Sequence, residues 1–532
     1  MKLRWLALGA IAAIVLGAPG VDSHADGKRW WSHIVFLADD KLEGRNTGSD
    51  GYRKAAVYVA GEFERSGLKP AGVSGYMQPV KFHSRKIVEE QSSLALVRDG
   101  QAEPLVLGED ATIGLRVDPA ESLEAPMAFV GYGLTIPELK IDDLAGQDLK
   151  GKIAVYVSGG PASIPGPLSS HYQSAAERGK FLQRAGVVGV AVIVNPLGMD
   201  IPWARSSLAR FQPAMGLAAA ELDESFGQRL GVTINPEHAD KILAGSGHTA
   251  VEILALAKER KPLPTFSLPA SLKAKVTVER SEAESPNVVG LLPGTDPKLK
   301  DEYVVLSAHL DHIGVGKPIN GDSINNGAMD NAAGVATMLE IAKTLHESKA
   351  KLRRSVLFVI VCGEEKGLLG SRFFATHPTV KPDQIVADLN VDMFLPLFPL
   401  HILTVLGLDE SDLGKTVQAV VEPMGVKVQR DLEPQRNVFV RSDQYSFIRQ
   451  GIPSLAFKVG YTPGSPEEAI VKKWLTDRYH APSDDLQQPV DLKAAGEFNG
   501  LLLRIAEAVA NQTARPRWND DSFFRRFAQG NL

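Results

Sequence analysis

The sequence predicts an α/β fold built around an open, largely parallel β-sheet. Two apolar runs, at residues 304–306 and 356–361, are continuous rather than alternating, and a third short segment, Leu389-Asn390-Val391, leads to Asp392. Continuous runs are typical of strands buried on both faces. A run of apolar residues at helical spacing over 332–345 predicts a helix between the first two strands. Each run is followed by an imidazole or a carboxylate, and such groups gather outside the carboxyl ends of strands in open sheets. We therefore expect one shared polar site, with the character of a metal centre.

Length and composition set the class of protein. With 532 residues the chain is too long for one ordinary core, so two or three domains are expected. Its 44% hydrophobic and 23% charged residues are typical of a soluble globular protein. With a formal net charge of -5, the chain has no excess of basic residues, which disfavours nucleic acid as a partner. The single cysteine, Cys362, excludes an intrachain disulfide and a thiolate metal cage.

The first residues, 1–25, have the pattern of a signal peptide. Lys2 and Arg4 precede an apolar run over 5–18, and Ser23-His24-Ala25 offers a cleavage site with small residues. The run is short for a membrane span, although an uncleaved N-terminal anchor is the alternative. We expect an exported protein, periplasmic or secreted, without a membrane span in the mature chain.

Residues 26–124 form the first predicted part of the mature chain. Two amphipathic helices are expected between residues 30 and 68, separated by a glycine-punctuated loop at 42–49. Short alternating segments between 78 and 117 indicate strands.

A new, β-rich unit is expected over residues 125–279. Apolar runs at 127–133, 152–157, 187–194 and 251–255 predict strands. Few histidines or acids follow these runs, so the sequence assigns this unit no chemistry. A lid, a spacer or a substrate-contact module is the expected role.

The chemistry-bearing unit is predicted over residues 280–511. Beyond the strands and helix of the opening paragraph, it contains predicted strands at 285–294 and 451–457 and predicted helices from 367 and at 494–510. Residues 512–532 are predicted to be a loose, polar tail.

Five residues spread along this unit have side chains that suit zinc. They are two imidazoles and three carboxylates: His309, Asp330, Glu365, Asp392 and His480. Two zinc ions a few ångströms apart usually share a bridging carboxylate. Taken singly, each has an ordinary alternative: a hydrogen-bonded structural histidine, a solvated Glu-Glu pair, or a turn or helix cap at Asp330.

Two neighbours of these residues are assigned supporting roles. Asp311 lies two residues beyond His309, and its carboxylate is expected to accept the other ring N–H and fix the tautomer. Glu364 directly precedes Glu365, and adjacent residues of an extended segment point in opposite directions. One of the two would then bind metal while its neighbour faces the substrate as a general base.

The ordered motifs of this region resemble those of the M28 family of zinc aminopeptidases. They are Ala308-His309-Leu310-Asp311-His312, Asp330-Asn331-Ala332-Ala333-Gly334, Glu364-Glu365-Lys366-Gly367-Leu368-Leu369-Gly370-Ser371, Asn390-Val391-Asp392-Met393 and Tyr479-His480. The resemblance implies a three-layer α/β/α sandwich with a mixed, largely parallel central sheet. It also identifies the unit at 125–279 as similar to a protease-associated insert.

The resemblance implies a role for each matching position. His309 and Asp392 would hold one zinc ion, Glu365 and His480 the other, and Asp330 would bridge the two. Glu364 would be the general base that activates the attacking water, and Tyr479 would donate a hydrogen bond to the developing oxyanion. Asp311 would support His309. From spacing alone, and not from the resemblance, we expect Asp484 or Asp485 to support His480 in the same way.

One position departs from the family pattern, and two others have competing interpretations. Where family members commonly have an acid before the bridging aspartate, this chain has Met329. Cys362 is interpreted as a buried thiol rather than a nucleophile. The segment 441–447 is interpreted as a helix start, or, through the resemblance, as part of the substrate pocket.

The function expected from these features is a two-zinc aminopeptidase acting on peptides with a free N-terminus. A carboxypeptidase or glutaminyl cyclase of the same fold, and a non-catalytic binding protein, are the alternatives. The full set of five ligands disfavours a one-zinc cyclase. A carboxypeptidase would need cations at the site, and the sequence does not locate Arg353, Arg354, Arg441 or Arg478 relative to it. The oligomeric state and the preferred N-terminal residue are not predicted.

Overall fold

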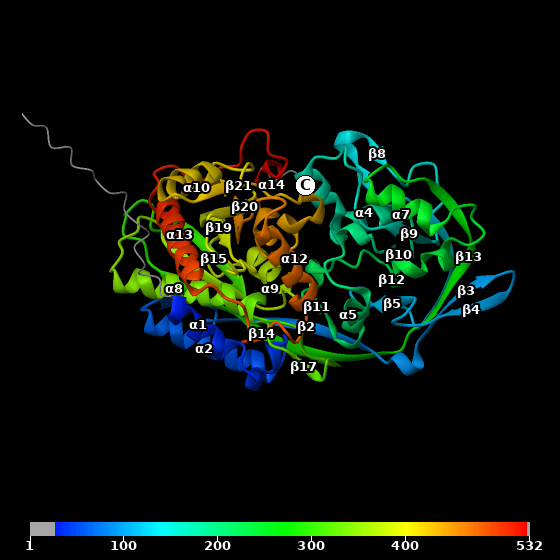
Figure 1. Ribbon diagram of the computed structural model, residues 1–532, viewed down its shortest axis with the longest axis horizontal. Coiled ribbons are helices and arrows are strands. Elements are labelled where there is room, and N and C mark those ends of the chain that lie inside the picture. The colour runs from blue at the N-terminus through cyan, green and yellow to red at the C-terminus, as the bar shows by residue number, and fades with distance from the viewer. Residues whose placement is uncertain (1–26, 529–532) are drawn as a thin grey trace, which may run out of the picture.

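A computed structural model describes residues 27–528, so the predicted signal peptide at 1–25 lies outside the described residues. The described chain contains two large β-sheets, which lie side by side (Figure 1). Along residues 27–528, none of the helices has both the length and the apolar character that crossing a bilayer requires.

The larger sheet has ten described strands. They are β1 (Lys69–Pro70), β2 (Met77–Ile87), β11 (Ala214–Leu217), β14 (Val278–Leu292), β15 (Tyr303–His309), β18 (Ser355–Val361), β19 (Ile385–Asn390), β20 (Ile402–Leu406), β21 (Lys427–Gln429) and β22 (Ser454–Val459). The sheet is mixed. Its centre, β18-β15-β19-β22, is parallel, whereas β14 and β2 on one side and β20 on the other pair antiparallel.

Alternate residues of the central strands face two different cores. In β15, Val304 and Leu306 belong to one apolar cluster and Val305 to the other. Helices cover the first face: α1 (Gly27–Leu37), α2 (Asp50–Arg65), α8 (Ala333–Glu347), α10 (Leu413–Val421) and α13 (Leu492–Asn511). The other face is covered by α9 (Leu369–Thr376) and α11 (Gln444–Ile448). The predicted three-layer sandwich is therefore present, and burial on both faces explains the continuous apolar runs.

The second sheet has eight described strands. They are β3 (Ser93–Arg98), β4 (Gln101–Leu105), β5 (Ala111–Gly114), β6 (Ser122–Val130), β9 (Ile153–Val157), β10 (Gly189–Ile193), β12 (Gly231–Ile234) and β13 (Thr265–Lys275). Strands β3, β4 and β5 therefore pair within this sheet, although they precede residue 125, where the sequence places the start of the second unit. Conversely, β11 pairs with β2 in the larger sheet.

One predicted strand of this unit is a helix. The apolar run at 251–255 lies in α7 (Ala250–Lys258), which begins at a Thr249 cap whose side chain accepts from the backbone N–H of Glu252. A short apolar run does not distinguish a strand from a helix, and the cap decides this case. The unit also contains α3 (Gly166–Gln173), α4 (Ala175–Arg184), α5 (Trp203–Ser206) and α6 (Ala239–Leu243).

The remaining described strands and α-helices are short or lie in the C-terminal part of the chain. They are β7 (Thr135–Ile136), β8 (Ile141–Asp142), β16 (Gly314–Ile319), β17 (Asp322–Asn325), α12 (Pro466–Arg478) and α14 (Arg525–Ala528). The prediction of a loose C-terminal tail is wrong for the described part, because Trp518, Phe524 and Phe527 are buried. These aromatic side chains pack with Tyr445 and Ile448 of α11, although the segment around them is polar.

Candidate metal centre

The candidate site lies at the carboxyl ends of three neighbouring parallel strands. Strand β15 ends at His309, which pairs in register with Val361 at the end of β18, and Ser307 of β15 pairs with Asn390 at the end of β19. The segments that follow β18 and β19 carry Glu364, Glu365 and Asp392. Parallel pairing therefore brings residues from distant parts of the sequence to one edge of the sheet.

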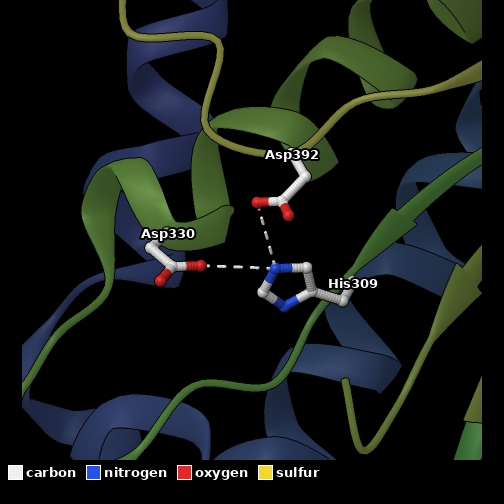
Figure 2. A group of neighbouring side chains, drawn as sticks. All are labelled: His309, Asp330 and Asp392. Atoms are coloured by element: carbon white, nitrogen blue, oxygen red, sulfur yellow. Dashed lines mark ion pairs between the residues drawn. The ribbon is translucent and has the colours of Figure 1, made fainter. Parts of the chain in front are cut away.

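The first group of potential ligands is His309, Asp330 and Asp392. Nε2 of His309 lies 3.3 Å from Oδ1 of Asp330 and 3.4 Å from Oδ1 of Asp392, and Figure 2 shows both carboxylates directed at the same ring nitrogen. Two atoms bound at about 2.0–2.1 Å to one tetrahedral zinc lie roughly 3.3–3.4 Å apart. The three side chains therefore have the spacing of ligands to one ion.

The second group shares Asp330. Oδ2 of this residue lies 3.3 Å from Nε2 of His480, and the same nitrogen lies 3.2 Å from Oε2 of Glu365. Since Asp330 presents its other oxygen to His309, one carboxylate faces both groups, as a bridging ligand does. The structure thus brings together all five residues to which the sequence assigns metal binding.

His312 is a residue of this site that the sequence analysis did not assign. Its Nδ1 lies 2.7 Å from Oε1 of Glu365 and 3.8 Å from Oδ2 of Asp330. His312, Asp330 and Glu365 thus form an alternative to the second group, with His312 in place of His480. The 2.7 Å contact is shorter than the spacing expected of two ligands to one zinc, whereas the contacts of His480 match it. The distances therefore favour His480 as the ligand and place His312 beside Glu365. Its only sequence signal is its position three residues after His309.

Several atoms of the cluster lack a hydrogen-bond partner. Within the described residues, Nε2 of His309, Oε1 of Glu365, Oδ1 of Asp392 and both ring nitrogens of His312 are buried and make no hydrogen bond. Buried polar atoms are nearly always hydrogen-bonded, so a group of buried nitrogen and oxygen atoms that face one another without hydrogen bonds is the arrangement expected of ligands to a cation. The chemistry of this set, imidazole nitrogen with carboxylate oxygen, fits zinc.

The charges of the cluster lead to the same conclusion. Burial opposes the charge of His309, but Glu364, Asp330 and Asp392 outweigh it and raise the pKa of His309 well above its ordinary value. The pKa of His480 is likewise raised, to about 10: burial lowers it, and Glu365 and Asp330 raise it. An excess of buried negative charge therefore surrounds the two imidazoles, and a divalent cation would neutralise it.

Asp311 supports the site differently from the prediction. Its carboxylate lies 3.9 Å from Nδ1 of His309, while its backbone carbonyl oxygen lies 3.1 Å from that nitrogen. When Nδ1–H donates to this carbonyl, Nε2 is left unprotonated and free to bind metal. The carboxylate instead accepts from the backbone N–H groups of Glu364 at 3.1 Å and Glu365 at 3.3 Å. Asp311 therefore holds the loop that carries the proposed base.

The expectation that Asp484 supports His480 is also wrong. The Asp484 carboxylate accepts from the backbone N–H groups of Met329 at 2.9 Å and Asp330 at 3.0 Å. Met329 contributes only its backbone N–H to this contact, and its side chain is buried in the larger core. A methionine in place of the family's acid therefore leaves intact the hydrogen bonds that position Asp330. Asp485 lies 3.7 Å from Arg478.

A buried arginine that sequence reasoning missed joins the loops behind the site. Arg45 is fully buried and donates to the carbonyl oxygens of Leu310 at 2.9 Å, Asn326 at 2.6 Å and Gly327 at 2.9 Å. These carbonyls flank the segments that carry His309 and Asp330. The glycine-rich loop at 42–49 is therefore structural support for the metal centre, a role that its turn-like composition conceals.

Glu364 and Tyr479 line the same cavity, of about 390 Å³, together with Glu365 and His480. Burial raises the pKa of Glu364 well above its ordinary value, an effect that His309 opposes and Glu365 reinforces. A carboxyl group with a raised pKa is suited to accept and return a proton near neutral pH. Burial also raises the pKa of Tyr479, so its hydroxyl stays protonated and able to donate.

Of the four arginines considered for a carboxypeptidase, one lies at this cavity. Arg353 pairs with Asp296 at 2.8 Å, and Arg354 with Glu302 at 2.6 Å. Arg478 donates to the backbone of Ser483. Arg441, by contrast, lines the cavity beside Tyr479.

Comparisons with known proteins agree with this geometry. Residues 287–506 match the family model described as "Peptidase family M28". A carboxypeptidase Q of Xenopus laevis is 23% identical over 366 residues, which are 68% of this chain and 65% of that relative, so the chain spans just under two thirds of its length.

Solved structures show the fold over nearly the whole chain. An aminopeptidase from Aneurinibacillus sp. strain AM-1 matches with a TM-score of 0.56 and 19% identity, over 94% of this chain and 96% of the other. A zinc aminopeptidase from Bacillus subtilis matches with a TM-score of 0.51 and 19% identity, over 92% and 97%. The family match does not extend to the second sheet, whose assignment as a protease-associated insert stays a prediction. Over residues 287–506 the chain is therefore similar to peptidase family M28.

Proposed function

We propose that this protein is an aminopeptidase that uses two zinc ions to hydrolyse N-terminal residues from peptides. The observation that carries the proposal is the pair of ligand groups joined by Asp330, whose two oxygens face His309 and His480 at 3.3 Å each. His309 and Asp392 would hold one ion, Glu365 and His480 the other. When bound, zinc supplies Lewis acidity, which lowers the pKa of water to about 7 and polarises the scissile carbonyl.

The protein's own residues carry the proton transfers. Glu364 takes the proton from the attacking water and later gives it to the leaving amine, so one water is consumed and one amine and one carboxylate are formed. The Tyr479 hydroxyl donates to the carbonyl oxygen as negative charge develops on it. Asp311 keeps Glu364 and Glu365 in place through their backbone N–H groups, at 3.1 and 3.3 Å.

A carboxypeptidase is the second candidate, because two arginines, Arg116 and Arg441, line the cavity that contains Glu364. Such cations would suit the α-carboxylate of a C-terminal residue. The glutaminyl cyclase alternative is disfavoured by the two complete ligand groups.

A panel of substrates tests the proposal. Aminoacyl-anilides, free peptides and N-blocked peptides are incubated with the protein before and after treatment with a chelator, and zinc is then restored. We expect cleavage of substrates with a free N-terminus, loss of activity on chelation and recovery with zinc. Release of C-terminal residues from N-blocked peptides would favour the carboxypeptidase, and activity that resists the chelator would refute both.

Export is part of the proposal as well. It is supported by the order of positive charge, apolar run and small residues at the N-terminus. N-terminal sequencing of protein recovered from the periplasm or medium would locate the cleavage site, expected after Ala25.

A further inference from the structure

A separate cavity, of about 200 Å³, lies where two parallel strands of the second sheet end. Strand β9 leads into Ser158-Gly159-Gly160 and strand β10 into Asn195, and these residues line the cavity. The peptidase unit contributes residues 435–437 and Arg441 to its walls. Neither Glu364 nor any of the five proposed zinc ligands is part of these walls, so the cavity is distinct from the metal centre.

The cavity walls carry an excess of positive charge. Among the described residues that line them there is no aspartate or glutamate, whereas four are arginines: Arg178, Arg260, Arg436 and Arg441. Acids outside the cavity offset Arg436, which lies 2.8 Å from Asp200 and 2.9 Å from Glu433. Arg441 lies 3.8 Å from the same Asp200. Within the described chain, no acid forms an ion pair with Arg178 or Arg260, so the charges of these two arginines are uncompensated.

Arg178 lies on α4 and has only 7% of its surface exposed. Its Nη1 donates to the backbone carbonyl of Gln173 at 3.1 Å, and its guanidinium carbon lies 4.5 Å from the centre of the Tyr156 ring. Its Nε and Nη2 are buried, and neither makes a hydrogen bond with a described residue. Buried N–H groups are nearly always paired, and a guanidinium keeps its charge when buried. These two groups are therefore suited to an anionic acceptor that enters from the cavity.

Arg260 reaches the same cavity from the turn that follows α7. Its backbone is held in place, because its carbonyl oxygen accepts from the N–H of Ala162 at 2.8 Å. The next carbonyl, of Lys261, accepts from the Tyr132 hydroxyl at 2.9 Å. The half-buried side chain of Arg260, by contrast, makes no hydrogen bond to any residue that the structure describes. Two unpaired arginines from different elements thus line one cavity.

Direct contacts fix the peptidase wall of this cavity against the second unit. The Asn437 amide donates to Oε1 of Gln173 at 2.7 Å, and its oxygen accepts from Oγ of Ser170 at 3.1 Å. The ion pair between Arg436 and Asp200 also joins the two units. An anion in the cavity would contact arginines of both units and add to these contacts.

We propose that this cavity binds a tetrahedral oxyanion of the phosphate class, with Arg178 and Arg260 as its main ligands and Arg436 and Arg441 beside them. A phosphate monoester carries a charge of about -1.5 to -2 and three acceptor oxygens, which match two unpaired arginines on different walls. A carboxylate offers a single charge and two oxygens in one plane. By contacting both units, the bound anion stabilises the docking of the second unit beside the metal centre.

Isothermal titration calorimetry with inorganic phosphate tests the site. The protein is titrated as purified and again after a chelator has removed bound metal, because phosphate can also bind zinc. We expect saturable binding of one phosphate per chain that persists after chelation, and binding of acetate that is at least about 10-fold weaker. Phenyl phosphate is titrated in parallel. Tighter binding of this ester identifies a phosphorylated organic ligand, and tighter binding of inorganic phosphate identifies the free ion.

Variants then assign the binding to the two unpaired arginines. Arg178→Gln and Arg260→Gln should each weaken phosphate binding by about 10–100-fold, the usual contribution of a hydrogen bond to a charged group. Because Arg260 lies in a turn and is half-buried, Arg260→Gln should fold even if Arg178→Gln does not. Arg184→Gln is the matched control, since this arginine is exposed on the same helix α4 and lies outside the cavity.

Thermal unfolding provides a second measurement. Phosphate should raise the unfolding temperature of the wild type and of Arg184→Gln more than that of the two cavity variants. This comparison separates specific binding from the general stabilising effect of phosphate, which all four proteins share.

Four outcomes would overturn the inference. Absence of saturable phosphate binding in the wild type would exclude the site. Binding that disappears with the metal would assign the phosphate to the metal centre. Equal binding by the wild type, Arg178→Gln and Arg260→Gln would exclude these ligands, and acetate that binds as tightly as phosphate would exclude the ligand class. None of these measurements depends on peptide hydrolysis, so their failure and that of the proposed function are separate results.

Discussion

The two sheets of this protein end their parallel strands in different ways, although each has four parallel strands flanked by antiparallel ones. In the larger sheet, β15, β18 and β19 lead into His309, Glu364 and Asp392. In the second sheet, β9, β10 and β12 lead into Ser158, Asn195 and Asn235.

The polar groups at the strand ends of the second sheet are hydrogen-bonded within the protein. The backbone N–H of Asn195 donates to Oγ of Ser158 at 2.9 Å, and its side chain accepts from Leu197 at 3.0 Å. The Asn235 amide donates to the carbonyl of Glu109 at 2.8 Å and accepts from Glu237 at 3.1 Å. The hydrogen bonds from Leu197 and Glu237 are helix-cap interactions, and the other two join the strand ends to segments distant in sequence. In the larger sheet, by contrast, the corresponding atoms of His309 and Asp392 lack such partners among the described residues. In this protein, the polar residues that follow parallel strands form the candidate site only where other protein groups leave their polar atoms without hydrogen bonds.

The largest expected effect concerns the proposed base. Glu364→Gln should lower kcat by about 10²–10⁴-fold, because proton transfer is lost. Burial raises the pKa of Glu364, so a neutral glutamine should be tolerated in the fold. Steady-state kinetics, metal analysis and thermal unfolding of the same preparation check this prediction. A variant that is inactive because it has lost its metal or its fold would contradict the assignment.

The pH profile sharpens the same prediction. A base acts only when deprotonated, so activity should rise as pH increases through the pKa of Glu364, which burial raises above its ordinary value. In the residual activity of Glu364→Gln, the acidic limb of the kcat profile should be absent. An unchanged limb would assign it to another group.

His309, Glu365 and Asp392 were expected to share one site, because an apolar run that leads to an acid or an imidazole is typical of a buried strand ending at a polar site. Asp330, in a short helical segment before α8, and His480, after α12, follow no such strand, and their assignment as ligands depended on the family resemblance. The sequence did not predict the contacts of Asp311 and Asp484, since proximity in sequence does not decide which backbone N–H a carboxylate accepts from. Arg45 and Arg178 were missed for a related reason. Their roles depend on loops and sheets that meet only in the folded chain, and no local pattern marks them.

The next largest effect on activity is expected for His480, the second imidazole of the proposed ligand set. Zinc analysis after exhaustive dialysis should show that His480→Ala loses one of two bound ions, with activity reduced at least about 10-fold. His312→Ala is the matched comparison, because its ring also contacts Glu365, at 2.7 Å. Because His312 contacts a proposed ligand and is not itself one, the variant His312→Ala should keep both zinc ions. Its affinity for zinc should be weakened by about 10–100-fold. The reverse pattern, one ion in His312→Ala and two in His480→Ala, would exchange their roles.

The smallest effect on activity is expected in the second unit, where a buried acid is fully paired. The carboxylate of Asp110 lies 2.6 Å from Nδ1 of His238 and 2.8 Å from Nζ of Lys241, and it accepts from the backbone of Val106 at 2.8 Å. Burial raises the pKa of Asp110, but Lys241, Val106 and His238 together lower it below its ordinary value.

Asp110→Asn should therefore reduce the free energy of unfolding by about 1.5–3 kcal/mol at neutral pH, the usual contribution of hydrogen bonds to a charged group, and leave turnover at the wild-type level. The stability that Asp110 contributes is fully present above the unfolded-state pKa, about 3.9, and is lost as pH falls through the lower folded-state value. The difference between wild type and variant should thus shrink on acidification, as measured by denaturant unfolding between neutral and acidic pH. Asp118→Asn is the control, since that carboxylate is exposed and pairs with Arg280 at the surface. Its effect should stay within about 1 kcal/mol. If Asp110→Asn instead abolished hydrolysis while the unit stayed folded, the polar groups of the second sheet would have a part in the chemistry, and the contrast between the two sheets would not hold.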